Sequence, residues 1–290
     1  MSVNKAHPST SVFKDNIFNG QVVFITGGRS GIGYTVVETL MRHGADAVIV
    51  GRDAKGLQES ASALQRATGK RCIAAAADVR SVPQIQAAVA KAVEVFGRID
   101  FVVCGAAGNF LAPIANLSEN AFRTVIEIDT LGTYNTVKAT LPHIRKTQGA
   151  YLHISATLHY RGVPYQAHVG AAKAAVDALS QVIAVEEGPR GVRSNVVAPG
   201  PIANTEGTLR LVPKGSEDLI PRIVPLGRFG ETIDIGNAAV YLFSPAASYV
   251  TGSVLVVDGG EMHIRGTALP YPESVLDPVS TKALVQGSKL

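Results

Sequence analysis

The chain of 290 residues contains only two cysteines, Cys72 and Cys104, and each stands alone inside an apolar run. A disulfide framework or a cysteine-based metal site needs more cysteines, at short and regular spacings. We therefore expect two buried free thiols, and we expect no metal site.

The chain also lacks a strong excess of charge and a long hydrophobic run. Its 27 basic and 23 acidic residues give a formal charge of +4, and the basic residues are dispersed. This balance suits anionic phosphate ligands but argues against a dedicated nucleic-acid surface. No window is long and apolar enough to span a membrane. The first 19 residues lack the pattern of a secretory or a mitochondrial signal. We expect neither nucleic acid nor a membrane span.

The last three residues, Ser288, Lys289 and Leu290, form the Ser-Lys-Leu sequence that the peroxisomal import receptor recognises. The stretch before them, from about Gly260, is rich in proline, serine and glycine and is suited to presenting the tail free of the fold. The sequence therefore predicts the import receptor as a partner and the peroxisome matrix as the location.

Short apolar runs alternate with longer amphipathic segments, which is the pattern of βαβ units around a parallel sheet. The hydrophobic content of 46% is ample for one large core. We predict one α/β doubly wound domain over residues 19–260, with an N-terminal extension (1–18) and a C-terminal extension (261–290). The seven predicted strands are Val22–Thr26, Ala47–Gly51, Arg71–Ala75, Phe101–Cys104, Tyr151–Ser155, Arg193–Val197 and Ser253–Val257.

Two segments have features beyond this alternation. Residues 201–228 contain four prolines and weak periodicity, and so long a loop is usually a functional segment, here interpreted as a substrate loop. The predicted helix at 167–186 is apolar almost all round, so it must be buried on several sides. Burial against a second copy of the chain would meet this demand, and we predict a homodimer or homotetramer.

A glycine-rich turn follows the first predicted strand and leads into a helical stretch. Glycines at 27, 31 and 33 let the backbone turn tightly and approach a pyrophosphate, which the N–H groups and dipole of the helix N-terminus then bind. The turn therefore predicts a nucleotide site formed by Gly27, Arg29, Ser30, Gly31, Ile32 and Gly33.

The end of the second predicted strand indicates which nucleotide binds. An NAD enzyme places an acidic residue there for the ribose hydroxyls, whereas this chain has Arg52. Together with Arg29, it suits a ribose 2′-phosphate, because guanidinium groups make charge-assisted hydrogen bonds to phosphate. Alternatively, both arginines are solvated surface charges and Asp53 holds a ribose hydroxyl. We predict NADPH, with Asp78 and Val79 against the adenine and Ala106 and Gly108 close to a ribose.

These motifs, with Lys173 and the segment Pro199-Gly200-Pro201-Ile202, resemble the short-chain dehydrogenase/reductase family over residues 18–260. The resemblance implies a single Rossmann-type domain with a seven-stranded parallel sheet. It also implies that Lys173 holds the nicotinamide ribose, and that Pro199, Gly200, Ile202 and Thr205 contact the nicotinamide side of the cofactor.

The chain departs from this family at three of its four usual catalytic positions. Asp129 replaces an asparagine, Ala156 replaces a serine and Val169 replaces the tyrosine, while Lys173 remains. His168 is a poor substitute for the tyrosine, because one step along a helix rotates a side chain by about 100°. Either the protein is not catalytic, or its reaction never forms an alkoxide that needs a tyrosine to protonate it.

The second possibility is favoured by five short segments, which resemble peroxisomal 2,4-dienoyl-CoA reductases: 106–111, 129–132, 155–158, 168–173 and 204–207. This resemblance implies NADPH-dependent reduction of 2,4-dienoyl-CoA to 3-enoyl-CoA in the β-oxidation of unsaturated fatty acids. Asp129 and Lys173 would be catalytic, with Asp129 holding a water molecule and Asp177 close enough to Lys173 to pair with it.

The same resemblance places Phe110 on the acyl or pantetheine path and Arg80 and Arg210 near the CoA phosphates. Two other functions stay open. One is reduction of another acyl-CoA, either trans-2-enoyl-CoA or 3-ketoacyl-CoA. The other is a non-enzymatic NADPH-binding or acyl-CoA-binding role.

Overall fold

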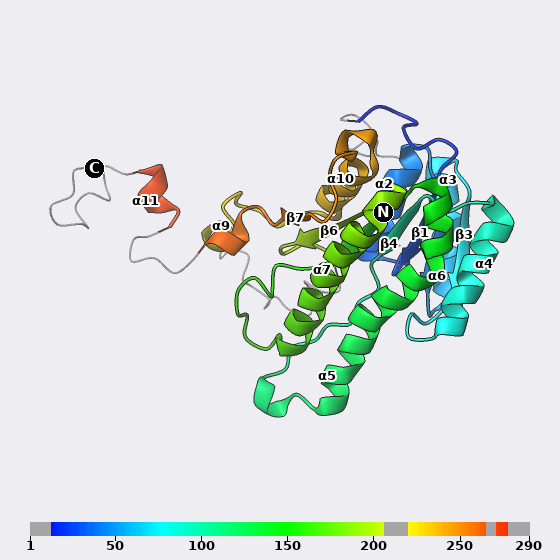
Figure 1. Cartoon of the computed structure of the whole chain (residues 1–290). Helices are drawn as coiled ribbons and strands as arrows, with labels where there is room; N and C mark the ends of the chain where they lie inside the picture. The colour runs from blue at the N-terminus through cyan, green and yellow to red at the C-terminus, as the bar shows by residue number, and fades with distance from the viewer. Residues whose placement is uncertain (1–12, 206–219, 265–270, 278–290) are drawn as a thin grey trace, which may run out of the picture.

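The computed structural model describes residues 13–205, 220–264 and 271–277 (Figure 1). Seven strands form one sheet in the order β3-β2-β1-β4-β5-β6-β7, and every neighbouring pair is parallel. The strands are β1 (Val22–Thr26), β2 (Asp46–Gly51), β3 (Cys72–Ala76), β4 (Phe101–Cys104), β5 (Ala150–Ile154), β6 (Arg193–Pro199) and β7 (Val254–Val257). The predicted fold is confirmed, with strand ends displaced by at most two residues.

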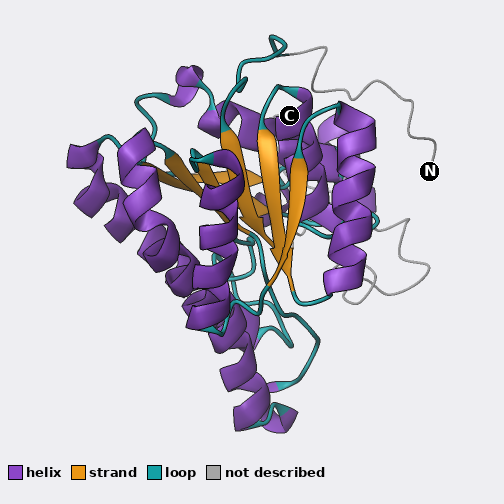
Figure 2. Ribbon diagram, turned by 90° about the vertical axis from the view of Figure 1, so that its right-hand side faces the viewer, coloured by secondary structure: helices purple, strands orange, loops and turns teal. Residues whose placement is uncertain are grey.

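Helices cover both faces of the sheet (Figure 2). One apolar core contains side chains of α2 (Gly31–Arg42), α3 (Ala54–Thr68) and α10 (Thr232–Phe243). The other contains side chains of α4 (Val82–Phe96), α6 (Gly132–Thr147) and α7 (Ala167–Glu187). Because both faces are covered, the central strands read as continuous apolar runs, and all five residues of β1 are buried.

Several short helices connect these layers. A short helix α5 (Glu119–Val125) leads into a π-helix (Ile126–Leu131). The others are α9 (Ile220–Ile223), α11 (Glu273–Leu276) and 3₁₀ turns at Ile114–Asn116, Gly188–Arg190, Pro245–Ala247 and Glu261–His263. Helix α9 lies within the segment predicted as a loop, 201–228. The predicted CoA contact Arg210 and the targeting residues Ser288, Lys289 and Leu290 lie outside the described residues.

The order of the strands places the predicted motifs at one edge. The chain order reverses between β1 and its neighbours β2 and β4, and ligands of open α/β sheets bind outside the carboxyl ends of the strands at such a point. Within the described ranges, no helix is long and apolar enough to cross a bilayer.

The two cysteines are buried free thiols, as predicted. Burial raises the pKa of Cys72 and that of Cys104 to about 12. Both therefore remain protonated near neutral pH and are poor nucleophiles, since the thiolate is the reactive form.

Helix α7 extends one residue beyond its predicted end and keeps one apolar side exposed. Its inner side is buried, but Val182 is 52% exposed and Val185 is 77% exposed. Exposed apolar side chains also lie on and beside the adjoining α6, where Leu131 is 49% and Tyr134 is 48% exposed. The predicted burial of α7 on several sides is therefore incomplete within one chain.

Candidate active site

A buried ion pair lies at the carboxyl edge of the sheet. The Nζ atom of Lys173 on α7 is 3.1 Å from Oδ2 of Asp129, and these side chains are 8% and 0% exposed. Lys173 also donates a hydrogen bond of 2.9 Å to the carbonyl of Ile154, the last residue of β5. The structure thus brings together the two residues that the sequence predicted to be catalytic.

A π-helix delivers Asp129 to this position. The i→i+5 spacing of a π-helix widens one turn, and such turns occur frequently at functional sites. Residues 126–131 adopt it between α5 and α6. The hydroxyl of Thr130 donates to the carbonyl of Ala172, which ties this turn to α7 one residue before Lys173.

The loop after β4 is tied to the same acid. The backbone N–H of Gly108 donates to Oδ1 of Asp129 at 2.8 Å. Oδ2 accepts no hydrogen bond from any described residue and has only Lys173 as its charged neighbour. A carboxylate held at one oxygen and open at the other has lone pairs available for a water molecule or a substrate proton.

The position of the missing tyrosine is filled by apolar packing. Val169 is buried and forms a small core with Val125 and Ala172, against which Phe110 and Leu158 pack. No described side chain supplies a phenol there. The position therefore excludes a proton donor of the usual kind at the reacting oxygen.

His168 turns toward Phe110, in keeping with the expected rotation on the helix. Its Nε2 atom lies 3.0 Å from the Phe110 carbonyl oxygen, and the two rings stack with their centroids 4.2 Å apart. Burial lowers the pKa of His168, although the Phe110 carbonyl and Asp129 act in the opposite direction. The imidazole is therefore neutral at neutral pH and fixes Phe110 in place.

The predicted pairing of Asp177 with Lys173 is wrong. Oδ2 of Asp177 instead accepts hydrogen bonds from Nε2 of His159 at 2.7 Å and from the hydroxyl of Tyr160 at 2.6 Å. Burial acts to raise the pKa of Asp177, but the hydrogen bonds from His159 and Tyr160 outweigh burial and hold the pKa below its usual range. Lys173 pairs with Asp129 instead, because the π-helix at 126–131 holds that acid against α7.

The glycine turn fits a dinucleotide because its backbone is packed tightly on one side and open on the other. A Cβ on Gly27 would lie 2.6 Å from the carbonyl oxygen of Gly105, and one on Gly33 would lie 2.2 Å from that of Gly27. Gly31 has φ +57° and open space beyond its Cα. Ser30 is the N-cap of α2 but makes no side-chain capping bond. The turn thus leaves N–H groups of the helix N-terminus available to a phosphate.

The two arginines of the predicted 2′-phosphate site differ in their partners. Nη1 of Arg29 lies 3.6 Å from Oδ2 of Asp53, and both side chains are about half exposed. Asp53 is the N-cap of α3 and accepts a hydrogen bond from the N–H of Gly56. Arg52 is exposed and makes no ion pair with any described residue. Its guanidinium is therefore available to an anion.

Asp78, predicted to lie against the adenine, is bound by Arg80, predicted to lie near the CoA phosphates. The guanidinium of Arg80 contacts both carboxylate oxygens of Asp78, the shortest distance being 2.6 Å. Hydrogen bonds from Arg80 lower the pKa of Asp78. Val79 packs tightly against Gly132, at which an added Cβ would lie 2.5 Å from a Val79 methyl group.

The segment after β6 reaches the same edge. Pro199 ends the strand, and the N–H of Gly200 donates to the carbonyl of Val257 in β7. Ile202 is buried and pairs with Gly230 in an isolated parallel bridge. The hydroxyl of Thr205 donates to the carbonyl of Ile202, which closes this turn.

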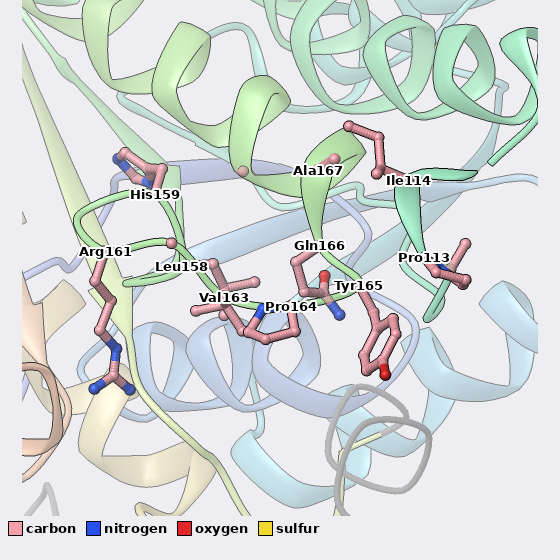
Figure 3. Close-up of a pocket in the computed structure, with 13 residues that line it drawn as sticks. Pro113, Ile114, Leu158, His159, Arg161, Val163, Pro164, Tyr165, Gln166 and Ala167 are labelled. Carbon is pink, nitrogen blue, oxygen red and sulfur yellow. The ribbon is translucent and has the colours of Figure 1, made fainter. Parts of the chain in front are cut away.

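A cavity of about 540 Å³ lies beside the N-terminal end of α7 (Figure 3). It lies between the loop after β4, at 112–114, and residues 158–170 before and within α7. Three of its lining residues, His159, Tyr165 and Gln166, were not among the predicted site residues. Tyr165 has φ +67°, a conformation that is unfavourable for a bulky residue and that is enriched at functional sites. Over the described ranges, no group of three His, Cys, Asp or Glu residues could hold a metal ion.

Comparisons with known proteins agree with this architecture. The family model described as Enoyl-(Acyl carrier protein) reductase matches residues 27–262. The chain is 49% identical to the peroxisomal 2,4-dienoyl-CoA reductase, (3E)-enoyl-CoA-producing, of Saccharomyces cerevisiae, over 93% of this chain and 94% of that one. It is 36% identical to a probable 2,4-dienoyl-CoA reductase, (2E)-enoyl-CoA-producing, of Bacillus subtilis, over 87% and 98%.

Among solved structures, a short chain dehydrogenase from Bacillus anthracis superimposes with a TM-score of 0.80 at 34% identity, over 87% of this chain and 100% of that one. The parallel sheet, the glycine turn and the buried lysine define a nicotinamide-dependent oxidoreductase of the Rossmann type. Together with the matches, they show that the chain belongs to the short-chain dehydrogenase/reductase family.

Proposed function

We propose that this protein is a peroxisomal, NADPH-dependent 2,4-dienoyl-CoA reductase that yields 3-enoyl-CoA in the β-oxidation of unsaturated fatty acids. The observation that carries the proposal is the buried pair of Lys173 and Asp129 beside a tyrosine position filled by Val169. The names of the relatives from yeast and zebrafish, both 49% identical, support the reaction and the location.

The chemistry explains why no tyrosine is needed. The bound cofactor supplies a hydride to the δ-carbon of the dienoyl thioester, and the negative charge of the resulting dienolate is spread to the thioester oxygen. An oxyanion of this kind needs positive charge and hydrogen-bond donors rather than a strong acid. Lys173 is buried at the carboxyl edge of the sheet, where it supplies positive charge and orients the nicotinamide ribose.

Asp129 is proposed to position the water molecule that protonates the dienolate. Its Oδ1 is held by the N–H of Gly108, while Oδ2 is open except for Lys173. A water molecule held between Oδ2 and the ammonium group would be positioned to deliver a proton to the α-carbon, and the proton is replaced from solvent. Protonation at the α-carbon moves the remaining double bond to position 3, which defines the product.

Reduction of trans-2-enoyl thioesters is the second candidate, favoured by the description of the matching family model as an enoyl reductase. Reduction of 3-ketoacyl thioesters would form an alkoxide, for which the apolar site around Val169 supplies no acid.

The assay that separates these functions follows NADPH absorbance with purified protein and 2,4-hexadienoyl-CoA, with trans-2-enoyl-CoA and 3-ketoacyl-CoA in parallel. We expect oxidation with the dienoyl thioester. Turnover of another thioester alone would reassign the enzyme, and NADPH binding without any turnover would favour a binding protein.

The choice of NADPH over NADH rests on Arg52, which is exposed at the end of β2 without an ion-pair partner among the described residues, and on the use of Asp53 as the N-cap of α3. Replacing Arg52 with alanine should raise the Kd for NADPH about 10- to 100-fold, as loss of a charge-assisted hydrogen bond predicts. The Kd for NADH should stay unchanged. Both are measured by fluorescence titration, with Arg66→Ala, an exposed arginine in the last turn of α3, as the matched control. Equal losses for both cofactors would contradict the assignment.

The CoA portion is proposed to bind near Phe110 and Arg80. Phe110 is stacked on His168 and packs against the small core that contains Val169. Arg80 is paired with Asp78 but its side chain is 39% exposed, which leaves surface for a phosphate. The proposed contact of Arg210 and the import receptor's contact with the terminal Ser-Lys-Leu rest on the sequence alone, as do the domain bounds 19–260.

The exposed apolar side of α6 and α7 is proposed as the interface of a homodimer or homotetramer. The two helices lie side by side (Figure 1), and solvent-exposed apolar patches of this kind mark interaction sites. Val185→Glu should shift the protein to monomers in size-exclusion chromatography with light scattering. Tyr249→Glu, at an even more exposed position outside both helices, should leave the assembly unchanged. An unchanged assembly with Val185→Glu would place the interface elsewhere.

A further inference from the structure

The cavity beside the N-terminal end of α7 has one wall formed by this helix. Gly170 lines it and lies three residues before Lys173, so the two share one side of α7 at a separation of one turn. Leu158 also lines it and packs on the small core that contains Val169. The cavity therefore begins where the family's tyrosine would stand.

The lining of this cavity suits hydrocarbon better than a charged or amide-rich group. Seven apolar side chains line it, among them Pro113, Ile114, Leu158, Val163 and Pro164. The charged lining residue Arg161 is already neutralised by an ion pair with Glu261. An apolar cavity with few polar groups is typical of a site for an apolar ligand portion.

The loop that forms this wall is anchored at two points. His159 and Tyr160 are both bonded to Asp177 on α7. One residue further on, Arg161 pairs with Glu261 after β7 and donates to the carbonyl of that residue. A wall fixed to both α7 and the segment after β7 keeps the width of the cavity constant when a ligand enters.

We propose that this cavity receives the part of the acyl chain that lies beyond the diene, and that its fixed wall sets the chain-length preference of the enzyme. The inference rests on the proposed dienoyl-CoA reductase function. The reacting carbons of every substrate lie at the ion pair, so only the distal methylene groups of longer substrates reach the cavity.

Gly170 offers a way to fill the cavity without disturbing the fold. An added Cβ at this position meets no atom within 4 Å, and the residue lies in a regular helix. Gly170→Leu should lower kcat/KM for 2,4-tetradecadienoyl-CoA at least about tenfold, as the loss of a few methylene contacts predicts. For 2,4-hexadienoyl-CoA, kcat/KM should stay within about twofold.

Two further variants complete the test. Gly188→Leu lies at the far end of α7, where an added Cβ also meets no atom within 4 Å. This variant should leave kcat/KM unchanged for both substrates. Gly162→Leu, on the loop wall and also free of neighbours, should repeat the selective loss and replaces Gly170→Leu if that variant fails to fold.

The outcomes separate the inference from the function beneath it. An equal loss for both chain lengths would mean that the pantetheine arm occupies the cavity, with the amide of Gln166 as its partner, and would overturn the inference. No change for either substrate would place the acyl chain elsewhere. A wild-type protein that reduces neither dienoyl thioester would overturn the proposed function itself.

Discussion

Replacing Asp129 with asparagine is expected to lower kcat for 2,4-hexadienoyl-CoA by about 10²- to 10⁴-fold, the range usual for the loss of a general acid–base group. Asparagine has the same shape and keeps an oxygen for the N–H of Gly108. What it removes is the charge at Oδ2, which lies 3.1 Å from Lys173 and accepts no hydrogen bond from any described residue. The Kd for NADPH should stay within about twofold, because Asp129 makes no proposed contact with the cofactor.

Stopped-flow kinetics and NADPH fluorescence titration measure these two quantities. Asp100→Asn is the matched control, since Asp100 is another buried acid, paired with Arg98 beside the opposite end of β4. It should lower stability but preserve kcat. Full activity of Asp129→Asn would remove Asp129 from the mechanism, and an equal loss in both variants would assign it a structural role only.

Replacing Lys173 with methionine is expected to lower kcat/KM for the dienoyl thioester by about 10²- to 10³-fold, since a charge that stabilises an oxyanion is worth that much. The KM for NADPH should rise as well, because the same ammonium group is proposed to hold the nicotinamide ribose. Methionine retains the length of the side chain but leaves Asp129, which is 1% exposed, as a buried charge without a partner. Such a loss costs about 3–5 kcal/mol of stability.

The double variant Asp129→Asn/Lys173→Met separates catalysis from stability. With both charges gone, most of the lost stability should return, as measured by urea unfolding, whereas activity should remain as low as in the Lys173 variant. Additive loss of stability in the double variant would show that the two side chains do not interact. Activity restored by the second substitution would contradict the proposed role of the ion pair.

The sheet could be predicted from sequence because each strand is buried on both faces, which produces apolar runs that are easy to recognise. Strands β1 and β4 have the predicted ends. Strand β6 continues to Pro199, two residues beyond its predicted end. Proline has no N–H to donate to the sheet, but it is tolerated at a position where no such hydrogen bond is needed. The pattern of apolar residues alone does not show that the strand continues to this proline.

The active site could be predicted only in part. The pairing of Asp129 with Lys173 depends on the π-helix at 126–131, and nothing in a single sequence specifies an i→i+5 turn. The rule that residues four apart on a helix interact led to the wrong partner for Asp177. The side chains that Asp177 does bind, His159 and Tyr160, come from a loop whose path is set by tertiary packing.

The local pair of Arg80 and Asp78 was missed for a different reason. Both were predicted as ligand contacts, one for CoA and one for the cofactor, and no sequence pattern indicates a pair between residues two positions apart. A turn after β3 folds the guanidinium back onto the carboxylate. Arg80 can still present its exposed side to a phosphate, because a guanidinium has five N–H donors.

The most direct test of the central claim is to locate the proton that the enzyme adds. The reaction of 2,4-hexadienoyl-CoA with unlabelled NADPH is run in D₂O, and the product is analysed by NMR. The proposed mechanism predicts one solvent deuterium at C2, none at C4, and a double bond between C3 and C4. Deuterium at C4 with a double bond between C2 and C3 would contradict it, as would the absence of NADPH oxidation.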